Sequence, residues 1–315
     1  MSTKKVLIIG IQGALAKITA ELLIKAHPDI RIHGVDSRPI DNIPKRPHIT
    51  VQQIKYNRTN FEKLFREHQF ESVLHLGRLG HSPAMGNIHK RIDINLVGTN
   101  TILELAQKFR SKKVVILSTH HVYGALPDNP MFLREDSPLR ASFKYAELRD
   151  VVEMDQMCTN WMWKNQNQIQ TIVLRPCNII GPQIKNSITQ YLKTPYAPLP
   201  LDYNPMFQFI HEFDMATMIV NAVEKLGTGI YNVAGDDVVS LHEAAEIIGV
   251  KKVLVPIIAV EQLAKVLTPV WKFPLYLLDY IKFPATLDNS ELKKTLGEDT
   301  FRFSAKEALE LLKLN

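Results

Sequence analysis

The stretch Val6-Leu-Ile-Ile-Gly10-Ile-Gln-Gly13-Ala-Leu-Ala16 decides the fold of this 315-residue chain. A short apolar run of strand length ends at Gly10, and apolar residues at helical spacing begin directly after Gly13 and continue to about residue 26. Gly10 permits a tight turn, and Gly13 lets the backbone come close to a pyrophosphate held by the N–H groups at the start of the helix. The stretch therefore predicts a phosphate-binding loop between a strand and a helix.

A carboxylate stands where such a loop needs its second contact. Asp36 ends the next predicted strand, at residues 30–36, about 20 residues beyond the loop, where it can bind a ribose 2′-hydroxyl group. Asp36 would repel a 2′-phosphate, so the sequence favours NAD over NADP, although Arg38 lies only two residues away. The alternative interpretation is an ordinary strand–turn–helix unit with a surface aspartate.

Strand-length and helix-length segments alternate outward from this unit. This alternation predicts an α/β fold, a Rossmann-type doubly wound parallel sheet with a smaller C-terminal substrate-binding domain. The predicted strands are 6–9, 30–36, 49–54, 72–76, 113–117 and 170–174, and the predicted helices are 14–26, 59–68, 89–109 and 143–163.

The pattern changes after residue 175, where six prolines fall between positions 176 and 205. We predict that residues 1–175 form the dinucleotide-binding domain and that residues 211–235 return to its sheet as a helix and a strand. Residues 176–210 and 236–315 then form the substrate-binding domain, with a short strand at 206–210 and a smaller helical segment from 240 to the end.

Composition excludes several classes of protein. Apolar residues make up 45% and charged residues 22% of the chain, which rules out general disorder. No apolar run reaches the length of about 18 residues that a membrane span requires, so no integral membrane segment is expected. Two cysteines cannot form a disulfide framework, which fits a reducing, cytoplasmic location. No cysteines and histidines have metal-ligand spacing, so no metal site is predicted.

The net charge is +6, which raises the question of a polyanionic partner. Residues 1–150 hold 23 Lys and Arg against 14 Asp and Glu, whereas residues 151–315 hold 15 against 18. No motif of interleaved basic and aromatic residues accompanies the excess. We therefore expect no nucleic-acid partner, only weak steering toward an anionic cofactor.

Several further segments, in order along the chain, resemble the extended short-chain dehydrogenase/reductases, the NAD-dependent epimerase/dehydratase family. The resemblance covers nearly the whole chain and does not depend on one motif. The matching segments are Ser72-Val-Leu-His-Leu-Gly77, Asn95-Leu-Val-Gly-Thr99, Leu117-Ser-Thr-His-His-Val-Tyr-Gly124, Arg175-Pro-Cys-Asn-Ile-Ile-Gly-Pro182, Phe209-Ile-His-Glu-Phe-Asp214 and Tyr231-Asn-Val-Ala-Gly235.

The resemblance implies a catalytic set of Thr119, Tyr145 and the cation at position 149. In this family a hydride moves to or from a carbinol carbon while a tyrosine moves the proton on its oxygen. A phenol with a pKa of about 10 is a poor base at neutral pH, so a nearby cation is needed to stabilise the phenolate. Thr119 would hydrogen-bond the reacting oxygen.

The chain departs from the family at position 149, which is Arg149 rather than lysine. Its spacing from Tyr145 predicts a cation beside the phenol on one helix face, but arginine cannot release a proton into a relay. Three interpretations remain: an active oxidoreductase-type site, an NAD-binding scaffold or sensor with weak or no turnover, and a merely solvated helix face.

Cofactor contacts follow from the loop and from the resemblance together. Ile54 replaces the usual aspartate at the adenine, so backbone contacts at Lys55 are expected there, and Asn95 supports the nicotinamide end. The expected cofactor-binding residues are Gly10, Gln12, Gly13, Ala14, Leu15, Asp36, Arg38, Lys55, Leu76, Gly77, Arg78, Asn95, Ser118, Tyr145, Arg149 and Pro176.

The substrate is expected to be a small molecule with a secondary alcohol or carbonyl carbon, a sugar or sugar nucleotide being one class. Asn178 stands where sugar-nucleotide members bind substrate, but Phe207 replaces an arginine that grips a phosphate in those members. His120 and His121 are either auxiliary acids or bases at the substrate or hydrogen-bonded loop residues. The aromatic segment 253–283 is interpreted as a lid, a subunit interface of a homodimer, a membrane-surface segment or core.

Overall fold

The computed structural model describes residues 4–40, 47–77, 88–259, 262 and 276–314. Its centre is one sheet of seven parallel strands in the order β12-β7-β5-β4-β1-β2-β3. The predicted doubly wound sheet is therefore confirmed. The strands are β1 (Lys5–Ile9), β2 (Arg31–Asp36), β3 (Ile49–Gln53), β4 (Ser72–His75), β5 (Lys113–Leu117), β7 (Gln170–Pro176) and β12 (Gly229–Val233).

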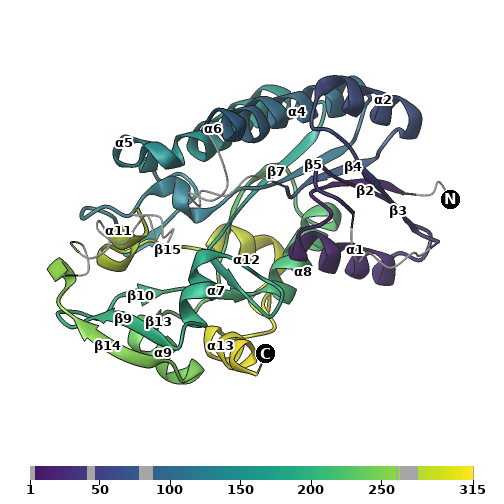
Figure 1. Cartoon of the computed structure of the whole chain (residues 1–315). Helices are drawn as coiled ribbons and strands as arrows, with labels where there is room; N and C mark the ends of the chain where they lie inside the picture. Colours follow the sequence, from purple (N-terminus) through teal and green to yellow (C-terminus); the bar gives the residue numbers. More distant parts are fainter. Residues whose placement is uncertain (1–3, 41–46, 78–87, 260–261, 263–275, 315) are drawn as a thin grey trace.

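Helices cover both faces of this sheet (Figure 1). On one face, α1 packs against α8; on the other, α4 packs against both α2 and α6. Because helices bury both faces, β4 and the first four residues of β5 are buried, as their apolar sequences require. The bounds are α1 (Ala14–Ala26), α2 (Arg58–His68), α4 (Thr99–Lys108), α6 (Arg149–Asn165) and α8 (Glu212–Glu224).

The strand order places β1 between β4 and β2, so the chain leaves β1 toward one side and returns later on the other. Ligands of such sheets bind outside the carboxyl ends of the strands at this reversal point. A cofactor site is therefore expected at the carboxyl ends of β1 and β4.

A smaller unit lies at the lower left of Figure 1 and joins segments from 178 to 314. Its own apolar cluster includes Ile180, Leu199, Phe209 and Leu309. Four two-stranded sheets occur in this part of the chain or beside it: β8 (Asn178–Ile180) with β11 (Phe209–His211), β9 (Tyr196–Pro200) with β14 (Lys251–Val255), β10 (Met206–Phe207) with β13 (Val239–Ser240), and β6 (Phe132–Leu133) with β15 (Thr286–Leu287). The helices of this unit are α7 (Ser187–Leu192), α9 (Leu241–Ile248) and α13 (Ala305–Lys313), whereas α11 (Leu277–Lys282) and α12 (Ser290–Leu296) pack against the core of the central sheet.

Several expectations about individual elements are wrong. The strand expected at 206–210 is two short strands, β10 and β11, in different sheets, and residues 240–315 contain strands as well as helices. The helix expected at 89–109 is not α-helical throughout, because residues 92–98 form a π-helical turn between α3 (Ile88–Arg91) and α4.

The helix expected at 143–163 is interrupted at the tyrosine of the predicted catalytic set. A short α5 (Ala141–Lys144) precedes Tyr145, which has extended backbone angles, and a 3-10 turn (Ala146–Leu148) separates it from α6. Residue spacing along a single helix therefore does not describe how Tyr145 and Arg149 are related.

Candidate functional site

The loop after β1 has the shape that its glycines predict. Gly10 has φ +89°, and a Cβ atom placed on it would lie 2.4 Å from the Cα atom of Gly77. The backbone of the loop is tied to β2, because the N–H groups of Gly10 and Ile11 both donate to the Val35 carbonyl, at 2.8 and 3.1 Å. Two loops thus cross at the ends of β1 and β4 where side chains would not fit. We call residues Gly10–Leu15 together with Gly77 the phosphate loop.

The helix that follows this loop offers its first N–H groups. Its N-cap residue, Gly13, carries no capping side chain, and the first turn of α1 contains no acidic residue. The unpaired N–H groups and the positive end of the helix dipole favour an anion at such a position. The residues present therefore fit the pyrophosphate of a dinucleotide.

Asp36 at the end of β2 is held in place from two sides. Its carboxylate accepts hydrogen bonds from the N–H group of Gln12 at 3.1 Å and from the Arg38 guanidinium at 2.8 and 3.0 Å. Burial by itself would raise the pKa of Asp36, but the hydrogen bonds from Arg38 and Gln12 hold it below the usual value. The Asp36 carboxylate stays charged beside the phosphate loop, and Arg38 donates to both of its oxygens.

The other expected cofactor residues lie in varied surroundings. Leu76 and Gly77 follow β4, Ser118 follows β5, and Pro176 ends β7, so all of these lie at the same edge of the sheet. Lys55 is exposed beyond β3. Arg78 lies outside the described residues.

Asn95 belongs to a buried polar group beneath the nicotinamide end expected from the family. It lies in the π-helical turn, and its side-chain amide donates to Asp150 at 2.7 Å. The Arg91 guanidinium lies 3.8 Å from the same carboxylate. Because Asp150 lies in the first turn of α6, this group fixes the start of α6 against the π-helical turn.

A second buried network lies beneath the end of β5. Ser118 donates to Asp155 at 2.5 Å, and Asp155 forms a two-point ion pair with Arg175, at 2.5 and 3.1 Å. Arg175 also donates to the Tyr123 hydroxyl, which in turn donates to Asn232. Burial raises the pKa of Tyr123 to about 12, so this hydroxyl stays protonated.

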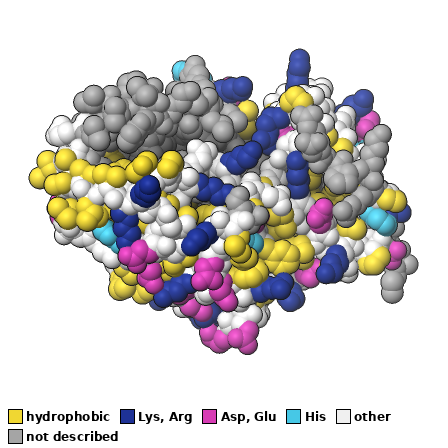
Figure 2. All heavy atoms as spheres, turned by 60° about the horizontal axis from the view of Figure 1, so that its bottom comes forward, with side chains coloured by type: hydrophobic (Ala, Val, Ile, Leu, Met, Phe, Trp, Pro, Cys, Tyr) yellow, Lys and Arg dark blue, Asp and Glu magenta, His cyan; other side chains and the backbone are white. Residues whose placement is uncertain are grey.

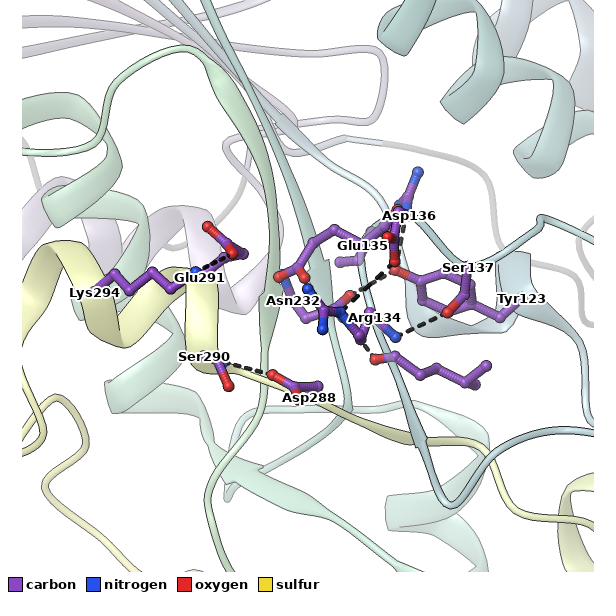
Figure 3. Close-up of polar contacts among 12 residues, drawn as sticks. Tyr123, Arg134, Glu135, Asp136, Ser137, Asn232, Asp288, Ser290, Glu291 and Lys294 are labelled. Atoms are coloured by element: carbon purple, nitrogen blue, oxygen red, sulfur yellow. Dashed lines mark hydrogen bonds and ion pairs between the residues drawn. The ribbon is translucent and has the colours of Figure 1, made fainter.

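Figure 3 shows how this network continues from Tyr123 to Asn232 and Glu135. The N–H group of Asn232 donates to Glu135 at 2.8 Å, and its side-chain amide donates to the Leu133 carbonyl. Asp288 and Ser290 lie beyond Asn232 in the same view. Polar contacts therefore connect the end of β5 with β12 and with residues 133–135.

Thr119 comes directly after Ser118 and is buried at the N-cap of a 3-10 turn (His120–Tyr123). The buried His120 donates from Nδ1 to the Pro176 carbonyl at 2.9 Å, and its ring lies 4.2 Å from that of His121. The partner of His120 is thus the last residue of β7, and the two histidine rings lie against each other. His75, the last residue of β4, has its Nε2 atom 2.8 Å from the Tyr56 hydroxyl, and burial lowers its pKa to about 4.

Tyr145 is buried, and its hydroxyl donates to Asp279 of α11 at 2.6 Å. The Lys144 ammonium lies 2.8 Å from the same carboxylate oxygen and 5.5 Å from the centre of the Tyr145 ring. Burial, and then the Asp279 carboxylate, raise the pKa of Tyr145 above its ordinary value. The phenol is therefore held protonated.

The expectation that Arg149 lies beside Tyr145 on one helix face is wrong. The Arg149 side chain is 67% exposed and pairs with Glu153 at 2.6 Å, one turn further along α6. The physical reason is the break at Tyr145, whose backbone is extended and which a 3-10 turn separates from α6. The cation in contact with Tyr145 is Lys144.

Sequence reasoning missed Asp279 and Lys144. The aromatic segment 253–283, which contains Asp279, is the signal that the sequence offers. Its described aromatic residues are Tyr276, Tyr280 and Phe283. Tyr280 donates to the His121 carbonyl at 2.8 Å, and its ring lies 4.8 Å from that of His121. The α11 helix therefore covers the end of β5. We call Thr119, His121, Lys144, Tyr145, Asp279 and Tyr280 the tyrosine site.

Asn178 and Phe207, the other two residues expected at the substrate, contact residues of their own neighbourhood. The Asn178 amide donates to the Gln208 carbonyl at 3.1 Å, and Phe207 is buried against Phe209 with ring centres 6.0 Å apart. A shallow pocket of about 210 Å³ borders this region. It is lined by Phe132, Gln208, Gly235, Asp236, Leu287, Asp288, Asn289 and Ser290.

The described part of the chain holds no group of three His, Cys, Asp or Glu side chains arranged to bind a metal ion. No described helix has both the length and the apolar character needed to cross a membrane. On the face in Figure 2, the described basic side chains are spread among acidic and apolar ones without forming a continuous band.

A family model for the NAD-dependent epimerase/dehydratase family matches residues 6–234. An uncharacterised protein of Mycobacterium tuberculosis is 26% identical over 195 residues, covering 62% of this chain. The chain spans only about half of that relative, 52% of its length. The UDP-glucuronate 4-epimerase of Thermodesulfobacterium geofontis is 25% identical over 77% of this chain and 79% of its own.

Solved structures share the fold at low sequence identity. The dTDP-glucose 4,6-dehydratase of Bacillus anthracis in complex with NAD superposes with a TM-score of 0.76 at 16% identity, covering 99% of this chain and 96% of that one. The UDP-glucose 4-epimerase of Thermotoga maritima with UDP-glucose gives 0.75 at 18% identity, covering 98% and 97%.

Proposed function

The chain belongs to the NAD-dependent epimerase/dehydratase family, and we propose that it is an enzyme that binds NAD in the phosphate loop and oxidises or reduces a secondary alcohol or carbonyl carbon. The observation that carries this proposal is the crossing of Gly10 and Gly77 in front of an uncapped helix, with the charged Asp36 beside it. This is the arrangement that a dinucleotide pyrophosphate and an adenosine ribose require.

The two ends of the proposed site have separate tasks. The N–H groups at the start of α1 would hold the pyrophosphate, and Asp36 would accept from the ribose hydroxyls. Arg149, which is exposed at the start of α6, is free to turn from Glu153 toward a ribose hydroxyl. NAD, when bound, would supply a carrier for the hydride of the carbinol carbon.

At the tyrosine site the protein would handle the proton. Thr119 is proposed to donate to the reacting oxygen, and Tyr145 to exchange the proton with it. Buried surroundings strengthen such hydrogen bonds, because water does not compete. Dehydrogenase and epimerase reactions use the same proton and hydride steps, and they differ in whether the hydride returns to the same substrate.

A nucleotide sugar is the proposed substrate class. Support comes from the relatives, among which are a UDP-glucuronate 4-epimerase and a UDP-glucose 4-epimerase of Dictyostelium discoideum, 25% identical over 253 residues, 70% of this chain and 72% of its own. The pocket lined by Gln208 and Gly235 is the described hollow nearest in sequence to Phe207 and is a candidate for part of such a substrate. Phe207 is buried in the apolar cluster and offers no charge to a phosphate, so the diphosphate would need other contacts.

The exposed position of Arg149 supports a second candidate. With no cation of α6 beside Tyr145, and with the Tyr145 hydroxyl already bound to Asp279, the chain would be a non-catalytic NAD-binding scaffold or sensor. In the enzyme the Tyr145 hydroxyl would exchange a proton with the substrate, whereas in the scaffold it would only bind Asp279.

The test begins with native purification and mass spectrometry of retained ligands, followed by assay against a panel of UDP- and dTDP-sugars. We expect bound NAD, and we expect Tyr145→Phe to reduce turnover about 100-fold or more while NAD binding stays within a few-fold. An epimerase would retain NAD and release no net NADH. If Tyr145→Phe leaves turnover unchanged, the proposed role of the phenol is wrong; if the wild-type protein binds NAD and turns over none of the panel, the scaffold is favoured.

A further inference from the structure

The tyrosine site contains a carboxylate and an ammonium group that the family pattern does not predict. Asp279 reaches Tyr145 from a segment 134 positions further along the chain. Its Oδ2 atom lies 2.6 Å from the Tyr145 hydroxyl and 2.8 Å from the Lys144 ammonium. One oxygen atom therefore accepts from both the phenol and the cation.

The surroundings give this contact more weight than a surface ion pair has. Tyr145 is 6% exposed, and the Asp279 side chain is 18% exposed. The rings of Tyr276 and Tyr280 lie 6.0 Å apart, and Tyr276 lies 6.1 Å from Tyr145. Hydrogen bonds between partly buried charged and polar groups are stronger than those in water, because solvent screening is reduced.

The direction of the hydrogen bond decides what the phenol can do. The Tyr145 hydroxyl donates its proton to Asp279, with the Ala125 carbonyl as a longer alternative acceptor at 3.3 Å. A phenol oxygen that donates one hydrogen bond keeps lone pairs that can accept another. A substrate hydroxyl can therefore donate to Tyr145 without displacing Asp279.

The usual route to a reactive tyrosine is not available here. Arg149 is turned to solvent and paired with Glu153, so it does not stabilise a phenolate. Burial and the negative charge of Asp279 both raise the pKa of Tyr145, so a free phenolate is disfavoured. If Asp279 receives the phenol proton while the Tyr145 oxygen takes up the substrate proton, no free phenolate forms.

We propose that Asp279 is the proton acceptor of the tyrosine site, that Tyr145 relays the substrate proton to it, and that Lys144 holds the carboxylate in place through their ion pair. This inference rests on the proposed function. In the oxidation of an alcohol, the substrate O–H proton moves to the Tyr145 oxygen while the Tyr145 proton moves to Asp279. The C–H electron pair leaves as hydride to NAD⁺, and the products are a carbonyl, NADH and a neutral Asp279 carboxyl group. The reverse reaction returns the same proton along the same path.

The test uses the full chain loaded with NAD and compares Asp279→Asn and Lys144→Met with the wild type. The first readout is the ionisation of Tyr145, followed by ultraviolet absorbance and isolated as the difference from Tyr145→Phe. Asp279→Asn removes a negative charge and a carboxylate acceptor, so we expect it to lower the pKa of Tyr145; Lys144→Met removes a cation, so we expect it to raise this pKa. This readout does not need a substrate.

The second readout is turnover of the sugar nucleotide that the wild type accepts, measured as kcat against pH. General acid–base catalysis contributes about 100- to 10,000-fold, so we expect Asp279→Asn to lower kcat within that range. The residual activity should rise with pH, because only a phenolate is left to act as base. Lys144→Arg keeps the charge and is expected to retain more activity than Lys144→Met.

Two controls separate this role from a change in net charge. Asp299→Asn removes one negative charge at an exposed position after α12 and is the control for Asp279→Asn. Lys63→Met removes one positive charge on the exposed face of α2 and is the control for Lys144→Met. Both are expected to leave the Tyr145 pKa and kcat unchanged.

Three results would overturn the proposal. An unchanged Tyr145 ionisation in Asp279→Asn would show that the carboxylate does not act on the phenol. A lowered Tyr145 pKa together with equal or higher kcat would make the contact a restraint rather than a proton path. If the wild type binds NAD and turns over nothing, the proposed function itself fails and this proposal fails with it, and that result is recognisable because it precedes any mutation.

Discussion

The phosphate loop and the tyrosine site lie at the same edge of one sheet, but they are built in different ways. The phosphate loop consists of backbone: a left-handed glycine, a crossing with Gly77 and the first turn of α1, all close to β1 and β4. The tyrosine site consists of side chains brought from β5, the break before α6 and α11. The first follows from local sequence, whereas the second depends on long-range packing.

The support of the two regions differs in the same way. The phosphate loop is held by backbone hydrogen bonds from Gly10 and Ile11 to β2. The tyrosine site rests on the buried ion pair of Asp155 and Arg175, because Asp155 also fixes Ser118, the residue before Thr119. Substitutions in the phosphate loop should therefore act through steric clashes, whereas substitutions in the support of the tyrosine site should act through unpaired charge.

The largest expected effect breaks the support of the tyrosine site. Asp155→Asn leaves the Arg175 guanidinium, which is 2% exposed, without a counter-charge. Removing one partner of a buried pair costs about 3–5 kcal/mol, so we expect the free energy of unfolding in urea to fall by that amount. Glu67→Gln on the exposed face of α2 is the matched control and should change it by less than about 1 kcal/mol. Equal effects of the two changes would mean that burial does not distinguish these pairs.

The next effect is steric and belongs to the phosphate loop. Gly10→Ala places a Cβ atom 2.4 Å from the Gly77 Cα atom at a φ of +89°, so the two loops must move apart. We expect a loss of about 2–3 kcal/mol in unfolding free energy and a lower NAD affinity in a binding titration. Gly227→Ala is the control, since a Cβ atom there meets nothing within 4 Å. A Gly10→Ala protein with unaltered NAD affinity would contradict the proposed pyrophosphate position.

A smaller effect concerns the choice of dinucleotide. Asp36→Ala removes a carboxylate that would repel a 2′-phosphate and releases Arg38 from its ion pair. Hydrogen bonds to charged groups contribute about 1.5–3 kcal/mol, so we expect the ratio of NADP to NAD affinity to rise about 10- to 100-fold. The exposed Asp29→Ala controls for net charge. If the ratio does not move, Asp36 does not contact the ribose.

The smallest effect is the pH dependence of the unfolding free energy, which is expected to differ between the two regions. The pKa of Asp36 is lowered in the folded protein, so its contribution to stability is present above the unfolded value of about 3.9 and is lost as the pH falls below it. The pKa of Tyr145 is raised, so its contribution is present below about 10 and is lost as the pH rises. In urea unfolding against pH, Asp36→Asn should flatten the acid side and Tyr145→Phe the alkaline side. A change on the opposite side in either variant would reverse the assigned direction.

Much of the fold could be predicted because its signals are local. The apolar runs around Val6–Ile9 and Lys113–Leu117 are short, continuous and bounded, as buried parallel strands are. The break at Tyr145 could not be predicted in the same way. Helical periodicity continues through it in the sequence, and the interruption is visible only where Tyr145 meets Asp279 and the Ala125 carbonyl.

The sequence by itself determined the α/β class, the family and the phosphate loop, because glycines, apolar runs and a strand-end carboxylate act over a few neighbouring residues. Only the tertiary structure decided which cation stands beside the phenol. Lys144 and Arg149 are both near Tyr145 in sequence, but the path of the backbone turns one toward Asp279 and the other toward solvent. The physical reason is that a side-chain charge acts over a few ångströms of space, and separation along the chain does not fix that distance.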